Sequence, residues 1–72
     1  MSSAAAIGEH TRIAGYALAG VEVLVAENPP SALSAWEALP ADVSLLIVTP
    51  MAEEALREQM VERPDLLRAR LP

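Results

Sequence analysis

Residues 43–48 read VSLLIV, and this segment most constrains the fold of the chain. Apolar side chains alternate to both sides of an extended backbone, so a strand here has to be covered on both faces. Two further apolar stretches, 4–7 (AAAI) and 21–26 (VEVLVA), also predict strands. Strands buried on both faces are typical of parallel sheets between helical layers. The sequence therefore predicts an α/β fold.

A segment that favours a helix follows each expected strand. Asn28 precedes two prolines and Thr49 precedes one, which in both cases joins a capping side chain to a residue suited to the first helical turn. Gly20 follows the first helical segment as a stop signal. Pro40 and Pro64 end the other two. The expected helices cover residues 11–19, 30–39 and 50–63.

Three strand–helix units at this spacing predict right-handed crossovers and a small open parallel sheet with flanking helices. In the three-layer, flavodoxin-like strand order of this class, the first strand lies centrally and the third lies beside it. We expect one domain over residues 1–63. Residues 64–72 are expected to form a tail, either a helical turn or an extended lead-in, toward a fourth strand that is missing.

Without a fourth strand, the third strand would lie at an open edge. Unpaired N–H and C=O groups on so apolar a strand favour association with another strand. The residues expected to form this interaction edge are Val43, Leu45, Ile47 and Val48. Either the 72 residues are a fragment of a longer chain, or a partner pairs with this edge. For a chain of natural length, the expectation is a homodimer formed edge to edge.

Composition narrows the classes of partner. The chain has a net charge of −5, five arginines and no lysine, which argues against nucleic acid or an anionic membrane as its main partner. It lacks cysteine, so disulfides and thiolate metal sites are excluded. No apolar run approaches the roughly 20 residues that span a bilayer, and the N-terminus lacks the features of a signal peptide. A cytoplasmic location is expected.

The loop after the first strand is the only candidate ligand site. Glu9, His10 and Arg12 lie where open parallel sheets bind ligands, and they could hold an anion or move a proton. The loop has no glycine-rich phosphate-binding pattern, and the single histidine has no partner ligands for a metal. A solvated loop is the favoured interpretation. A phosphoreceiver would need an aspartate where Thr49 ends the third strand. No catalytic residue, cofactor or metal is therefore expected.

The third helix has a charged side rich in glutamate. Glu53 and Arg57 are spaced for an i,i+4 ion pair, while Glu54, Glu58 and Glu62 face the same solvent side. A solvated surface is the favoured interpretation. The alternative is a docking face for a partner helix rich in arginine or lysine.

Several segments, in order along the chain, resemble the F subunit of the V/A-type (vacuolar/archaeal-type) ATPases and ATP synthases. Members of that family have a strand ending in I-G, a G-[FY]-x-L-A-G-[VI] run, and an I-I-L-I-T-E-x-x-A-E-x-I stretch. The corresponding segments here are residues 7–8, 14–21, 25–29, 32–39, 45–54 and the final Leu71-Pro72. In the family, an L-P pair precedes the fourth strand. Pro50 replaces the acid that usually follows the threonine of the third strand.

The resemblance implies a non-catalytic subunit of the central rotor stalk in a proton-translocating complex. Such a protein would be cytoplasmic and peripheral to the membrane-bound part. It would dock on the coiled-coil D subunit of the rotor and on other stalk subunits, while nucleotide chemistry would belong to the A and B subunits. The family's C-terminal helical arm, which can modulate ATP hydrolysis, is expected to be missing here. The alternatives are a small flavodoxin-like ligand-binding or adaptor module, and an orphan relative of the family with another function.

Overall fold

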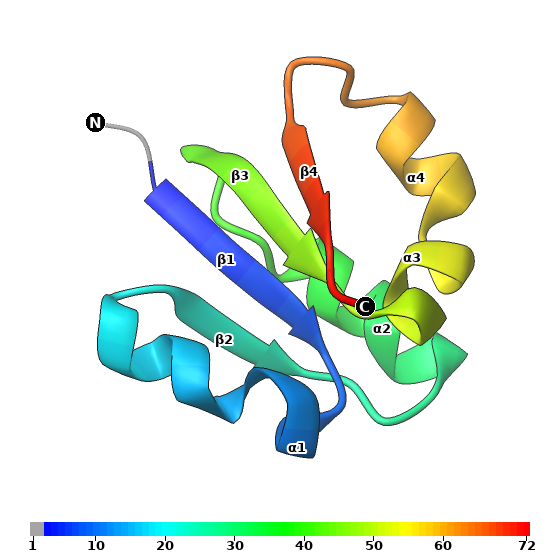
Figure 1. The fold of residues 1–72 in the computed structure, drawn as a ribbon. Coiled ribbons are helices and arrows are strands. Elements are labelled where there is room, and N and C mark those ends of the chain that lie inside the picture. Colours follow the sequence, from blue (N-terminus) through cyan, green and yellow to red (C-terminus); the bar gives the residue numbers. More distant parts are fainter. Residues whose placement is uncertain (1–2) are drawn as a thin grey trace.

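Four parallel strands form one sheet in the computed structural model, which describes residues 3–72 (Figure 1). The strands are β1 (Ser3–Gly8), β2 (Glu22–Val25), β3 (Val43–Val48) and β4 (Leu67–Arg70). Their order across the sheet is β2-β1-β3-β4. The α/β class is confirmed, and β1 lies centrally beside β3, as expected from the crossover pattern.

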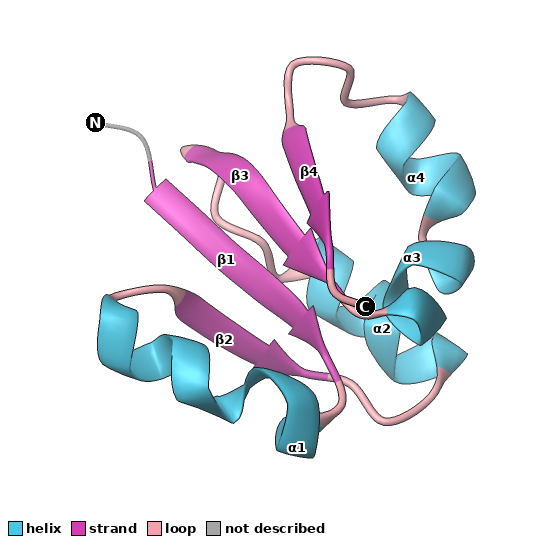
Figure 2. Ribbon diagram, viewed as in Figure 1, coloured by secondary structure: helices cyan, strands magenta, loops and turns pink. Residues whose placement is uncertain are grey.

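Helices cover both faces of the sheet, but unequally (Figure 2). The elements are α1 (His10–Ile13), the 3₁₀-helix η1 (Ala14–Ala19), α2 (Pro29–Glu37), α3 (Pro50–Ala55) and α4 (Arg57–Val61). α1 and η1 pack on one face, against β1 and β2, while α2, α3 and α4 lie on the other. Among the described residues, no helix has both the length and the apolar character needed to cross a membrane.

The helix starts follow the capping signals in the sequence. The side chain of Asn28 accepts a hydrogen bond from the backbone N–H of Ser31 at 2.9 Å, and that of Thr49 accepts one from Ala52 at 3.4 Å. Each cap satisfies one of the N–H groups that an α-helix leaves without a partner in its first turn. In both helices a proline occupies the first position, where no N–H is needed.

Two expected helices differ from the observed elements. The segment 11–19 is α-helical only up to Ile13 and then continues as the 3₁₀-helix η1, which ends at Gly20 with φ 81°. The expected helix 50–63 is divided at Leu56, whose φ of −103° and ψ of 9° interrupt the ladder between α3 and α4. Leu56 is completely buried, so its packing into the core fixes the position of this break.

The expectation that the fourth strand is missing is wrong. Residues 67–70, within the expected tail, form β4 and pair in parallel with residues 45–48 of β3. β3 therefore has a neighbour on each side, β1 and β4, and offers no open edge for the expected edge-to-edge homodimer. The alternation of leucine and alanine with arginine in β4 hid the strand, because it lacks the β-branched and aromatic residues that favour strands.

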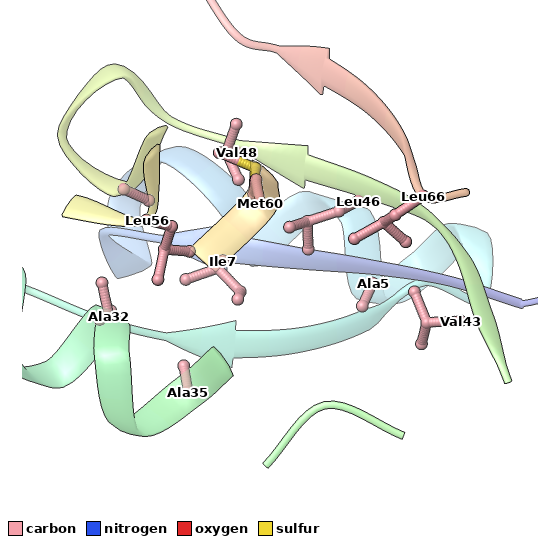
Figure 3. Close-up of a cluster of buried hydrophobic side chains, with 12 residues drawn as sticks. Ala5, Ile7, Ala32, Ala35, Val43, Leu46, Val48, Leu56, Met60 and Leu66 are labelled. Carbon is pink, nitrogen blue, oxygen red and sulfur yellow. The ribbon is translucent and has the colours of Figure 1, made fainter. Parts of the chain in front are cut away.

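Two apolar cores lie on opposite faces of the sheet. The larger core is enclosed by α2, α3 and α4, and Figure 3 shows its central side chains; they include Ile7, Val43, Leu46, Val48, Leu56, Met60 and Leu66. The smaller core lies under α1 and consists of the buried Ala6, Ile13 and Ile47. Tyr16, Val21, Val23 and Leu71 pack around it and stay partly exposed. The α1 side of the molecule is therefore the less completely buried one.

β1 and β3 approach closely where both strands end. Thr49 is completely buried, and its backbone N–H donates to the carbonyl of Ile7 at 3.3 Å. A Cβ atom built on Gly8 would lie only 2.3 Å from Cγ2 and 2.7 Å from Oγ1 of Thr49. Only glycine fits at position 8 without displacing the residue that caps α3.

We predict that Gly8→Ala lowers the free energy of unfolding by about 1–3 kcal/mol, the usual range for overpacking. Gly15→Ala is the matched control, because nothing lies within 4 Å of a Cβ added there. The control is expected to be neutral or stabilising by up to about 1 kcal/mol, since alanine restricts the unfolded chain. Urea denaturation of the two variants measures the difference. Equal stabilities would contradict the tight contact between Gly8 and Thr49.

Candidate functional site

The carboxyl ends of the strands bring together residues that are distant in the sequence. Glu9 and His10 follow β1 directly, and Glu27 follows β2. The backbone N–H of His10 donates to Oε2 of Glu27 at 3.0 Å, which joins the two loops. Glu9 is half-buried, whereas the side chains of His10 and Arg12 are exposed. The location expected for this loop is therefore correct, and Glu27 is an additional member that its sequence context did not reveal.

Glu9 is held in its charged form. The nearby Thr49 hydroxyl, the backbone N–H of Glu9 and the Arg12 guanidinium lower the pKa of its carboxyl below the usual 4.5, against a smaller opposing effect of desolvation. Its Oε1 atom is buried and has no hydrogen-bond partner among residues 3–72. Glu9 thus lies against the start of α3 and takes part in the contact between the loop after β1 and the end of β3.

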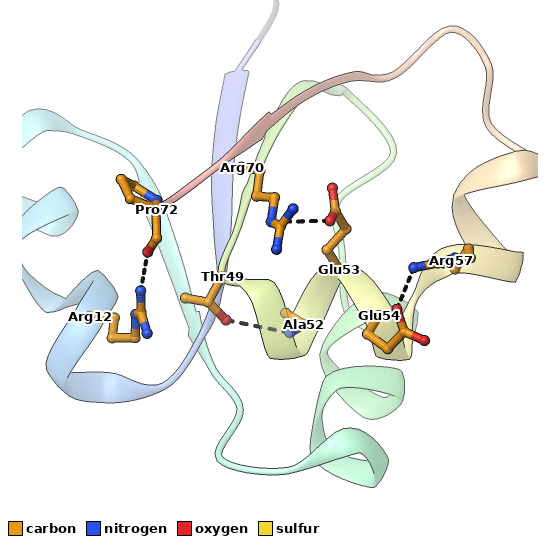
Figure 4. Close-up of polar contacts among 8 residues, drawn as sticks. All are labelled: Arg12, Thr49, Ala52, Glu53, Glu54, Arg57, Arg70 and Pro72. Atoms are coloured by element: carbon orange, nitrogen blue, oxygen red, sulfur yellow. Dashed lines mark hydrogen bonds and ion pairs between the residues drawn. The ribbon is translucent and has the colours of Figure 1, made fainter.

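Arg12 contacts Pro72, beyond the end of β4 (Figure 4). Its Nη2 atom donates to the backbone carbonyl of Pro72, so the guanidinium bridges α1 and the segment after β4. Glu9, in contrast, is directed to Thr49. The expected ligand residues therefore contact different parts of the chain. Within residues 3–72, no three histidine, cysteine, aspartate or glutamate side chains gather into a group that could hold a metal ion.

An ion pair joins β4 to α3, which lies over this part of the sheet. Nε of Arg70 lies 3.3 Å from Oε1 of Glu53 (Figure 4). Arg57 pairs instead with Glu54, one helical turn away in the i,i+3 spacing. The expected pair between Glu53 and Arg57 is therefore wrong. The division of the helix at Leu56 places Arg57 in a new helix, so the i,i+4 geometry does not extend across it.

The face of β3 and β4 opposite to α2, α3 and α4 is only partly covered, because Ile13 of α1 packs against Ile47 of β3 while Leu67 and Ala69 of β4 are exposed. The register pairs Leu45 with Leu67 and Ile47 with Ala69, so these four side chains lie on the same face. We call them the β3–β4 face. Leu67 is 69% exposed and Leu45 is partly exposed, whereas Ile47 is buried in the smaller core. The two strands span about 10 Å, which equals the diameter of one helix.

The side chains of the four residues expected to form an open edge lie on the two faces of the sheet at β3. Val43 and Val48 are buried in the larger core, and Ile47 is buried in the smaller one. Only Leu45 is partly exposed, through the face of the sheet and not through its edge. The sequence thus identified an apolar strand correctly, but the surface that remains accessible is a face, because β4 occupies the edge.

Comparisons with protein-family models, with curated proteins and with solved structures found no match to the chain. The case for a function therefore rests on the geometry described above and on the resemblance seen in the sequence.

We predict that Glu9 contributes stability that depends on pH. Because the folded state lowers the pKa of Glu9, this contribution is fully present above pH 4.5 and is lost as the pH falls through the lower pKa of the folded protein. The difference in unfolding free energy between the parent chain and Glu9→Gln should therefore shrink between about pH 6 and pH 3. Urea denaturation across this range measures it. A difference that stays constant would contradict the lowered pKa.

Proposed function

We propose that the chain is a docking protein without a catalytic role of its own, related to the F subunit in the central stalk of a V/A-type rotary ATPase. The segments that carry the resemblance lie in corresponding kinds of element. Residues 7–8 end β1, residues 20–21 lead into β2, residues 28–29 begin α2, and residues 45–49 span β3 and the cap of α3. In this proposal the protein is cytoplasmic and peripheral to a membrane-bound complex, and nucleotide chemistry belongs to other subunits.

One of the segments compared with the F-subunit family does not occupy the expected place in the fold. Leu71 and Pro72 follow β4, so this pair does not precede a fourth strand as the L-P pair of the family does. Leu71 instead donates its backbone N–H to the carbonyl of Val48 at 2.9 Å and packs against the smaller core. The proposal keeps the other segments and treats residues 67–70 as the fourth strand of the domain.

The β3–β4 face is the observation that carries the proposal. Parallel sheets are normally covered on both faces, and here Leu45 is partly exposed and Leu67 and Ala69 are exposed. The side chains of the β3–β4 face are aliphatic, so its complement is the apolar side of a helix and not a charged surface. With β4 only four residues long, the face measures about 10 Å by 13 Å, far below the roughly 800 Å² per partner of a standard interface. A second copy held by this face alone would dissociate readily.

A long helix of a coiled coil satisfies both requirements. Its apolar side can lie on the β3–β4 face, and its length can continue beyond the four residues of β4 to bury further surface. The coiled-coil rotor protein expected from the resemblance is a partner of this kind. Docking there would complete the layer that the chain leaves open on the α1 side of the sheet.

A ligand-binding module is the alternative, and the loop after β1 distinguishes the two functions. Under that alternative, the double change His10→Ala with Arg12→Ala would abolish binding of a phosphate or carboxylate ligand. We predict instead that this double variant binds the coiled-coil rotor protein within about two-fold of the parent, because the loop lies outside the β3–β4 face. Isothermal titration with the rotor protein, ATP, ADP and phosphate measures both. A large heat with ATP or phosphate, and none with the rotor protein, would support the alternative.

We predict that Leu67→Glu weakens binding to the coiled-coil rotor protein at least about ten-fold, since it places a charge where an apolar helix would pack. Arg68→Glu is the matched control, because this neighbouring residue is exposed on the other face of the same strand. Both positions are exposed, so stability should change by less than about 0.5 kcal/mol in either variant. Binding is measured with the rotor protein encoded in the same genome. Equal loss in the two variants, or loss in Arg68→Glu alone, would overturn the docking surface.

A further inference from the structure

A groove separates α2 from the bend between α3 and α4. It has a volume of about 350 Å³ and is lined by Leu33, Glu54, Ala55, Arg57, Glu58 and Gln59. We call it the α2–α4 groove. Because α2, α3 and α4 lie on the side of the sheet away from α1, the groove is on the opposite side from the β3–β4 face. It is a separate surface that the proposed function does not use.

The groove exists because the helical segment after β3 bends. Leu56 is completely buried and adopts non-helical backbone angles, so α3 ends at Ala55 and α4 starts at Arg57. Ala55 is half-buried, and on the α2 side Leu33 is 39% exposed. The groove therefore offers two aliphatic side chains to a partner between walls that carry charged residues.

The charged residues that line the groove carry a small net negative charge, with Glu54 and Glu58 against Arg57. Within α2, α3 and α4 there are four glutamates and a single arginine, but Glu53 pairs with Arg70 and Glu37 lies outside the groove. That arginine, Arg57, pairs with Glu54, whereas Glu58 makes no ion pair within residues 3–72. The carboxylate of Glu58 thus favours a cation in the groove.

We propose that the α2–α4 groove docks a basic amphipathic segment of a second protein. One aliphatic side chain of the segment packs against Leu33 and Ala55. A lysine or arginine one helical turn away pairs with Glu58. Arg57 competes for the same negative charge by holding Glu54. Removing Arg57 therefore strengthens the docking, which a purely solvated surface would not show.

The probe is a helical peptide of about four turns, built from alanine with leucine at positions i and i+4 and lysine on either side. A second peptide carries glutamate in place of every lysine. Titration of the ¹⁵N-labelled chain with the lysine peptide should shift the amide signals of Leu33, Ala55 and Gln59 before those of β4. Binding should weaken as salt is raised, because the pairs are exposed. The glutamate peptide should not bind.

Three variants test the residues of the groove. Glu58→Lys should weaken binding of the lysine peptide roughly three- to ten-fold, and Arg57→Ala should strengthen it about two-fold. Glu22→Lys makes the same change of charge on β2, outside the groove, and should change the affinity by less than about two-fold. Thermal unfolding checks that each variant folds.

Shifts confined to β4, binding that salt does not weaken, or equal effects of Glu58→Lys and Glu22→Lys would each overturn the groove as the docking site. So would the absence of binding at millimolar peptide. The β3–β4 face is tested separately by Leu67→Glu and Arg68→Glu, which lie outside the groove.

Discussion

Thr49 packed against Gly8 is the contact on which the carboxyl edge of the sheet depends. The threonine ends β3, caps α3, bonds to the carbonyl of Ile7 and lies beside the carboxylate of Glu9. It is also the only polar or charged residue among those that the structure buries within residues 3–72. A single small residue on each strand thus sets the distance between β1 and β3 and the direction in which α3 leaves the sheet.

The two faces of the sheet give the domain two unlike surfaces. Three helices enclose the larger core on one side, and their outer side is acidic and grooved. On the other side, α1 and η1 pack on β1 and β2 and α1 reaches β3 at Ile47, which leaves Leu45 partly exposed and Leu67 and Ala69 exposed. A chain of this size has little apolar surface to spare for its own core. The exposed aliphatic side chains of β3 and β4 are therefore apolar surface that the domain does not bury by itself.

The sequence predicted the elements whose signals are local. Asn28 and Thr49 marked two helix starts because a capping side chain and a proline stand next to each other. It did not predict the break at Leu56, which arises when that side chain is buried between distant elements. It also missed β4, whose arginines read as solvent-exposed residues of a tail. The carbonyl of Pro72 as a partner for Arg12 depends on that strand, so it could not be foreseen either.

The alternation in β4 does more than divide its side chains between two environments. Arg70 reaches Glu53 only when it stands opposite Val48, and in that register Leu67 and Ala69 lie on the aliphatic side. A slip by one residue would turn the arginines toward the aliphatic side and the leucine toward the glutamates of α3. The alternating side chains of β4 thus fix its register against β3. This matters most in a strand of four residues, whose few ladder hydrogen bonds would otherwise distinguish one register from the next only weakly.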